Sequence, residues 1–113
     1  MQNIARIQAL NDVFRRSASG PLLVNGQMVV TQGVLAQGED FLARAIVAVR
    51  SFNDFDEDND PYGEHDYGSF TLDGQKLMWK IDYYDRKCQC GSDDPSDPSR
   101  TRRVLTILLL SEY

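Results

Sequence analysis

Two stretches of the chain carry apolar residues at helical spacing. In residues 2–17 the apolar positions from Ile4 to Phe14 recur every three or four residues, which places them on one face of a helix. Residues 38–52 carry a wider apolar face, and Glu39 and Asp40 precede it, where acidic side chains suit the dipole of a helix N-terminus. The pattern therefore predicts two amphipathic helices.

The second half of the chain follows the two-residue alternation of strands. Residues 67–72 and 77–84 alternate apolar and polar positions, with Asp73-Gly74 close behind the first run, which predicts a hairpin. Residues 102–111 are almost continuously apolar from Val104 to Leu110. That run predicts a final strand in the interior of the sheet.

A further short turn occurs at Asn25-Gly26, between the apolar runs 22–24 and 28–31. Asn-Gly between apolar runs is a strong hairpin signal. Because the first run has only three residues, we expect either a small hairpin or a single strand, in which only the second run joins the sheet.

These elements, in the order α-β-α-β-β-β, predict an α+β fold. Tight turns between strands indicate an antiparallel sheet of about four strands, and the two helices must then cover one face as a two-layer sandwich. The chain has 113 residues, of which 42% are hydrophobic. This length and composition are typical of one globular domain, and we expect residues 1–113 to form it.

The net charge of −5 is concentrated in the middle of the chain. Residues 1–52 carry five basic and three acidic side chains, residues 53–99 carry four and thirteen, and residues 100–113 carry three and one. The regional charges are therefore +2, −9 and +2. An acidic balance argues against direct nucleic-acid binding, because phosphate contacts need a basic surface. An acidic interaction surface and simple solvation of loops both remain open.

Several function classes find no support in the sequence. No apolar run approaches the roughly 18 residues of a membrane-spanning helix, and the N-terminus lacks the pattern of a signal peptide, so we expect a cytoplasmic protein without membrane contact. The chain has one histidine, His65, and lacks phosphate-loop, dinucleotide and zinc-protease motifs. We expect no cofactor and no metal.

The two cysteines stand as Cys88-Gln89-Cys90. A disulfide across one residue would close a strained ring, and a structural zinc site needs four ligands, which only His65 and nearby carboxylates could complete. We expect reduced thiols in a loop, with a metal site and a redox role as alternatives.

Five strings of the sequence stand out, namely Ile7–Arg15, Phe52–Phe55, Glu57–Gly68, Trp79–Asp85 and Arg103–Ile107. Together they resemble a bacterial family of uncharacterised domains. The resemblance implies a small single-domain protein encoded on plasmids or other mobile elements. It implies no activity, and Cys88-Gln89-Cys90 is not part of it.

The acidic residues between 53 and 66 suggest three kinds of chemistry. Asp54, Asp56, Asp58 and Asp60 alternate as in a calcium-binding loop, but the sixth and twelfth positions lack the required Gly and Glu, which leaves only an irregular divalent-cation site open. A hydrolase-like or metal-binding enzyme could use His65 with Glu64 and Asp66 as a general base, although no nucleophile is evident. His65 could instead fix a turn through a carboxylate or a carbonyl.

The third possibility, which we favour, is protein binding. Closely spaced acids interleaved with tyrosines offer charge and aromatic anchors to a basic protein partner. Such a partner could be a nucleic-acid-binding complex of host defence, inhibited as by anti-CRISPR or anti-restriction proteins. We expect a monomer or weak homodimer with no catalytic residue. The predicted partner-binding residues are Asp54, Asp56, Glu57, Asp58, Asp60, Tyr62, Glu64, His65, Asp66, Tyr67, Asp82, Tyr84 and Asp85.

Overall fold

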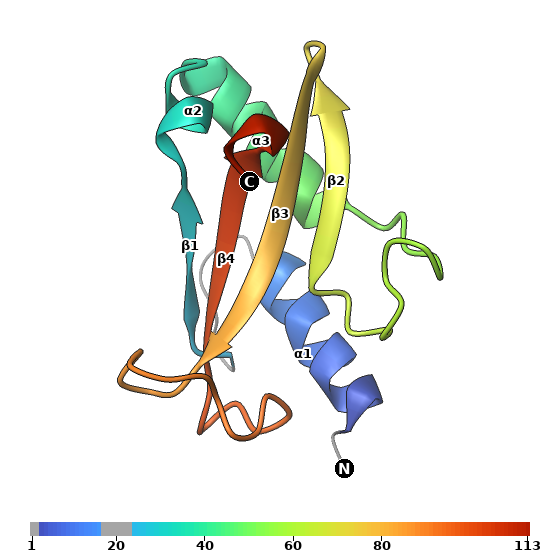
Figure 1. The fold of residues 1–113 in the computed structure, drawn as a ribbon, viewed down its shortest axis with the longest axis vertical. Helices are drawn as coiled ribbons and strands as arrows, with labels where there is room; N and C mark the ends of the chain where they lie inside the picture. Colours follow the sequence, from blue (N-terminus) through green and yellow to red (C-terminus); the bar gives the residue numbers. More distant parts are fainter. Residues whose placement is uncertain (1–2, 17–23) are drawn as a thin grey trace.

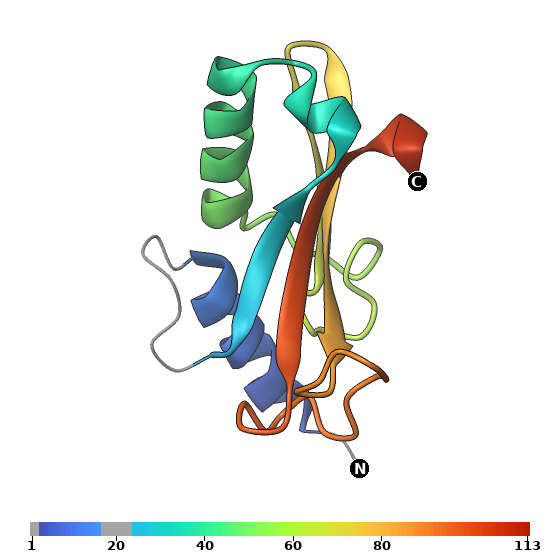
Figure 2. The ribbon, with the colours of Figure 1, turned by 90° about the vertical axis from the view of Figure 1, so that its left-hand side faces the viewer.

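The computed structural model describes residues 3–16 and 24–113, which form one mixed sheet with helices on one side. Figures 1 and 2 show α1 and α3 packed together behind the sheet, while the C-terminal turn lies on the other side. The elements are α1 (Ile4–Arg16), β1 (Gly26–Val30), α2 (Gln32–Leu35), α3 (Glu39–Ser51), β2 (Tyr67–Leu72), β3 (Gln75–Tyr84), β4 (Arg102–Leu109) and the 3-10 turn η1 (Leu110–Glu112).

The sheet order is β1-β4-β3-β2, which confirms the predicted α+β fold and the interior position of β4. The hairpin at Asp73-Gly74 also forms, because both residues adopt positive φ angles, 52° and 77°, as a tight two-residue turn requires. The final strand ends at Leu109, two residues before the predicted limit, and continues as η1.

The prediction of an antiparallel sheet is wrong for one strand pair. β1 runs parallel to β4, with Val29 opposite Thr106. Turn signals fix only the direction of strands that follow one another directly, and β1 is far from β4 along the chain. β1 contains most of the second of the two apolar runs around Asn25-Gly26 and joins the sheet beside β4. Residues 22 and 23 of the first run lie outside the described residues.

Close packing explains Gly26 better than a turn does. A Cβ atom there would lie 2.5 Å from the carbonyl oxygen of Arg103 and 2.6 Å from the ring of Phe14. Gly26 thus lets α1 approach the edge of the sheet.

The core lies between the sheet and the helices. β3 and β4 contribute alternate side chains, among them the buried Trp79 and Ile107, which are paired across the two strands. Ala45 and Val49 of α3 pack onto the same cluster. No helix of the described residues 3–16 and 24–113 is long and apolar enough to cross a membrane.

Gly68 offers a test of this packing. A Cβ atom at Gly68 would lie 2.5 Å from Trp79 Nε1 and 2.8 Å from the ring of Phe52. We expect Gly68→Ala to lower the free energy of unfolding by roughly 1–3 kcal/mol, the usual cost of overpacking, as measured by urea denaturation. The exposed neighbour Ser69→Ala is the control and should change it by less than about 0.5 kcal/mol. Equal stability of the two variants would contradict the packing.

Candidate functional site

Residues 53–66, the acidic segment, fold as a loop that leaves α3 and passes beside α1 before it enters β2 (Figure 1). We call residues 54–62 the acidic arm. Within the arm, Asp56 Oδ1 accepts the N–H groups of Asp58 and Asn59, both at 2.9 Å, and the Asn59 amide donates to the Asp54 carbonyl at 2.7 Å. These local hydrogen bonds shape the arm, because Asp and Asn side chains readily replace backbone partners in turns.

Arg15 fastens the start of this loop to α1. Its side chain is 0% exposed, and Nη1 donates to the carbonyls of Val49 and Phe52, both at 2.8 Å. The last carbonyls of a helix have no partner within the helix, so Arg15 supplies donors at the C-terminal end of α3. The guanidinium also pairs with Asp12 at 3.1 Å and lies 5.0 Å from the centre of the Trp79 ring.

Burial lowers the pKa of Arg15, while its hydrogen bond and charge interaction with Asp12 act in the opposite direction. Asp12 therefore compensates part of the cost of burying the cation.

His65 fastens the end of the loop to the same helix. Its Nδ1 lies 3.0 Å from both carboxylate oxygens of Asp12, and its Nε2 lies 3.5 Å from Asp60 Oδ2. The ring stacks on Phe55 with centroids 3.8 Å apart and planes 5° from parallel. The Asp60 side chain also accepts the backbone N–H of His65 at 3.1 Å. We call Asp12, Arg15, Phe55, Asp60 and His65 the clamp.

A second polar cluster joins the loop to the sheet. The Tyr83 hydroxyl donates to Glu64 at 2.7 Å and accepts from the Asn11 amide at 2.8 Å. Asn11 Oδ1 in turn accepts from Arg103 Nε at 2.6 Å, and Arg103 Nη2 donates to the Pro95 carbonyl at 2.6 Å. Burial and the bond to Glu64 raise the pKa of Tyr83, so the hydroxyl keeps its proton and remains a donor.

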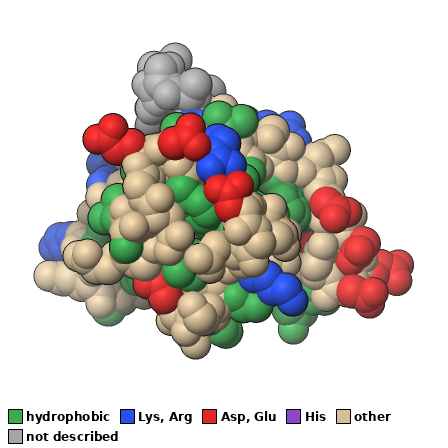
Figure 3. All heavy atoms as spheres, turned by 90° about the horizontal axis from the view of Figure 1, so that it is seen from above, with side chains coloured by type: hydrophobic (Ala, Val, Ile, Leu, Met, Phe, Trp, Pro, Cys, Tyr) green, Lys and Arg blue, Asp and Glu red, His purple; other side chains and the backbone are tan. Residues whose placement is uncertain are grey.

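The structure divides the predicted site residues into two groups. Asp54, Asp56, Glu57, Asp58 and Tyr62 are exposed, and Tyr62 is 78% exposed. Figure 3 shows acidic side chains gathered at the end of the molecule where Figure 1 places the loop between α3 and β2.

The second group is partly buried or lies elsewhere. Asp60, Glu64 and His65 make the intramolecular bonds described above. Asp66 and Tyr67 lie at the start of β2, and Asp85 caps the turn after β3 by accepting the Gln89 N–H at 3.0 Å. Asp82 pairs with Lys80. Asp82 and Tyr84 are the neighbours of the core residue Tyr83 along β3, so their side chains face the side of the sheet away from the helices. Partner contact by either group stays a prediction.

Sequence reasoning missed four residues of the two clusters, Asn11, Asp12, Arg15 and Arg103. Arg15 lies in the last turn of α1, where a cation suits the helix dipole, and its burial was not predicted. One signal was available, because Asn11 and Arg15 are four residues apart and lie on the helix face that also carries Ile7. A polar pair on the apolar face of a helix indicates a buried polar network.

The geometry of His65 fits the turn-fixing role better than catalysis. A general base needs a ring nitrogen within reach of a substrate proton, whereas both nitrogens of His65 face carboxylates and the ring is 18% exposed. Among the residues that the structure describes, no group of three or more His, Cys, Asp and Glu side chains is placed to hold a metal ion.

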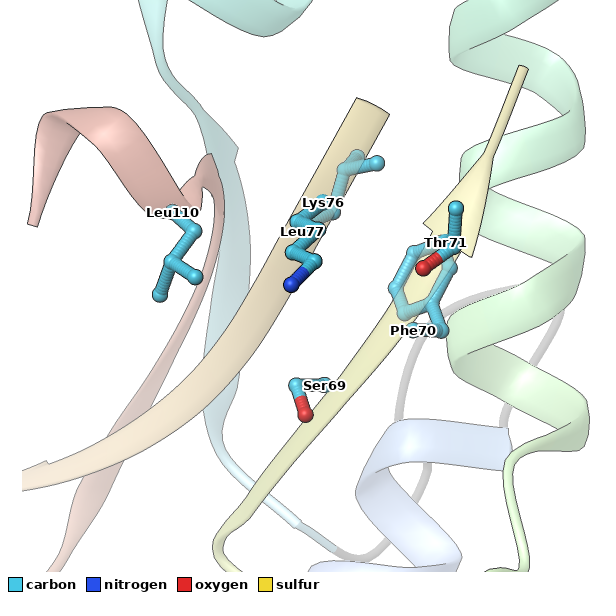
Figure 4. A pocket seen from close by; sticks show the side chains of 6 residues that line it. All are labelled: Ser69, Phe70, Thr71, Lys76, Leu77 and Leu110. Atoms are coloured by element: carbon cyan, nitrogen blue, oxygen red, sulfur yellow. The ribbon is translucent and has the colours of Figure 1, made fainter. Parts of the chain in front are cut away.

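The remaining candidates lie apart from the clamp. Cys88 and Cys90 are exposed free thiols in the loop after β3. A shallow pocket of about 290 Å³ lies between β2, β3 and η1, lined by Ser69, Phe70, Thr71, Lys76, Leu77 and Leu110 (Figure 4). It includes none of the predicted site residues.

Comparison with known proteins identifies a family. The family model described as "Protein of unknown function (DUF3768)" matches residues 30–112. The match covers most of the chain, which therefore belongs to this family. Searches of the curated proteins and of the solved structures found no match.

The buried guanidinium yields the first prediction for this site. We expect Arg15→Met to lower the free energy of unfolding by about 3–5 kcal/mol, because it leaves Asp12 and two buried carbonyls without their donor. The exposed neighbour, replaced as Arg16→Met, should change it by less than about 0.5 kcal/mol. Urea denaturation measures both, and a fully stable Arg15→Met would contradict the clamp.

Asp66 yields a pH-dependent prediction. Burial and then the charge of Glu64 raise the pKa of Asp66 to about 6, above the value near 3.9 of an unfolded chain. The folded protein therefore binds more protons between pH ~4 and ~6, so the contribution of Asp66 to stability falls as the pH rises through that window.

Asp66→Asn should remove this part of the pH dependence and be more stable than the original chain at pH 7. Urea denaturation at pH 4.5 and 7 measures both effects. An unchanged difference between the two pH values would refute the assignment.

Proposed function

We propose that this member of the DUF3768 family is a non-enzymatic binding protein that docks its acidic arm onto a basic protein surface. The observation that carries the proposal is the division of one segment into two halves. Phe55, Asp60 and His65 face inward and hold the loop in place. The outer side chains are four exposed carboxylates beside Tyr62, namely Asp54, Asp56, Glu57 and Asp58.

The outer carboxylates are available for a partner. In the described part of the chain, the side chains of Asp54, Glu57 and Asp58 take part in no hydrogen bond or ion pair. Their negative charges are therefore uncompensated and close together. Such a group attracts a positive surface at long range and accelerates association.

The clamp favours binding in a second way. Ordering a loop on association costs free energy, and a loop already held in place avoids much of that cost. Tyr62 adds a rigid aromatic side chain, of the type that often dominates binding energy at interfaces. The arm thus combines charge with an exposed aromatic side chain.

The proposed partner is a basic protein that binds nucleic acid. Its groove recognises closely spaced negative charges, which the acidic arm also offers. Together with the sequence resemblance to mobile-element proteins, this chemistry supports a role as an inhibitor of host defence, of the anti-CRISPR or anti-restriction kind. The rival role, a small hydrolase or metal enzyme using His65, Glu64 and Asp66, is less consistent with a ring enclosed by two carboxylates.

A capture experiment tests the proposal. The bait proteins are the original chain and Asp54→Asn/Glu57→Gln/Asp58→Asn, exposed to a nuclease-treated bacterial extract. We expect the original chain to retain basic nucleic-acid-binding proteins, and the triple variant to lose most of them, because it removes three uncompensated charges without removing a hydrogen bond. Mass spectrometry measures the recovered proteins.

The matched control is Glu39→Gln/Asp40→Asn/Asp93→Asn, which changes the net charge equally at other exposed sites and should retain the partners. Tyr62→Ser should weaken retention, and added single-stranded DNA should compete. Equal recovery by both triple variants would argue that the arm is not the docking surface.

A further inference from the structure

The clamp places one imidazole between two carboxylates that belong to different elements. Asp12 comes from α1 and lies 3.0 Å from Nδ1, whereas Asp60 comes from the arm and lies 3.5 Å from Nε2. The Asp60 side chain is 6% exposed and that of Asp12 is 19% exposed. His65 is therefore the link between the arm and the helix, in a partly dehydrated setting.

The number of protons on the ring decides how well this link works. A doubly protonated imidazole has a donor on each nitrogen and can bond both carboxylates. A neutral imidazole has one donor, so its other nitrogen presents a lone pair to a carboxylate. In the protonated state the charges of Asp12, Asp60, Arg15 and His65 also balance, whereas the neutral ring leaves one uncompensated negative charge.

We propose that His65 is a proton-operated latch, which holds the acidic arm against α1 while the ring is protonated and releases it when the ring loses one proton. The latch regulates the docking surface of the proposed function. Its biological purpose rests on that function, whereas the latch itself does not. Release separates His65 from Asp60 and unstacks the ring from Phe55, which frees the arm between its attachments at Arg15 and β2.

Other charged groups around the ring act in defined directions. Arg15 on α1 pairs with Asp12 at 3.1 Å and offsets its charge. Glu64 on the loop accepts the hydroxyl of Tyr83 from β3. Asp66 is a second possible source of pH dependence. As the pH rises, its carboxyl group ionises and adds a negative charge near Glu64 and Asp60.

The test follows the arm directly in the full-length chain, with no partner present. Hydrogen–deuterium exchange of residues 53–66, corrected for intrinsic rates, gives the opening equilibrium at pH values from 5.5 to 8. NMR chemical shifts of the His65 ring give its protonation state over the same range. We expect the opening equilibrium to rise with pH in step with the loss of the ring proton that the NMR shifts record.

Three variants separate the latch from general charge effects. His65→Gln, whose side-chain amide does not titrate, should lose the part of the pH dependence that follows the protonation state of the ring. Glu57→Gln removes an arm charge outside the clamp and Asp66→Asn removes the competing carboxyl group, and both should keep the dependence. Should His65→Gln fail to fold, Asp60→Asn serves in its place and should reduce the dependence.

The latch is refuted by constant opening in the original chain, by an undiminished pH dependence in His65→Gln, or by its disappearance in Asp66→Asn. Since exchange is measured without a partner, none of these outcomes affects the capture experiment at fixed pH. Loss of partner capture would likewise leave the latch measurement intact.

Discussion

The buried guanidinium of Arg15 is the interaction on which the rest of the structure depends. It lies beneath the loop that joins α3 to β2, where it bonds two carbonyls at the end of α3, pairs with Asp12 and lies against the Trp79 ring. A cation without these partners could not remain there, because dehydration of an isolated charge costs several kcal/mol. α1, α3, the loop and β3 are therefore positioned by one side chain.

This arrangement gives the acidic segment two roles. Asp60 of this segment faces inward and contacts His65, which also contacts Asp12 of α1, whereas the carboxylates that face outward leave the arm strongly negative. The same residue types thus stabilise the loop from within and provide charge for a partner outside. Because the inner contacts fix the backbone, the outer side chains keep their spacing, which a mobile acidic tail would not do.

Local patterns predicted those parts of the fold that depend on neighbours in the sequence. Helical periodicity located α1 and α3, and Asp73-Gly74 located the β2–β3 hairpin. The parallel pairing of β1 with β4 could not be read this way, since it depends on contacts between distant segments. The burial of Arg15 and Arg103 was missed for a similar reason, because the carbonyls that accept their hydrogen bonds come from other segments of the chain. For the site, composition located the acidic segment but did not separate its inner carboxylates from its outer ones.

That separation is the central claim, and urea unfolding of two charge-matched variants at pH 7 tests it most directly. Asp12→Asn/Asp60→Asn removes two inward carboxylates, and Asp54→Asn/Asp58→Asn removes two outward ones. The inward pair should lower the free energy of unfolding by about 2 kcal/mol or more, because the buried cation of Arg15 loses its counter-charge and each replaced carboxylate loses one acceptor oxygen. The outward pair should leave it unchanged within about 0.5 kcal/mol. Equal losses in the two variants, or a larger loss in the outward pair, would contradict the account.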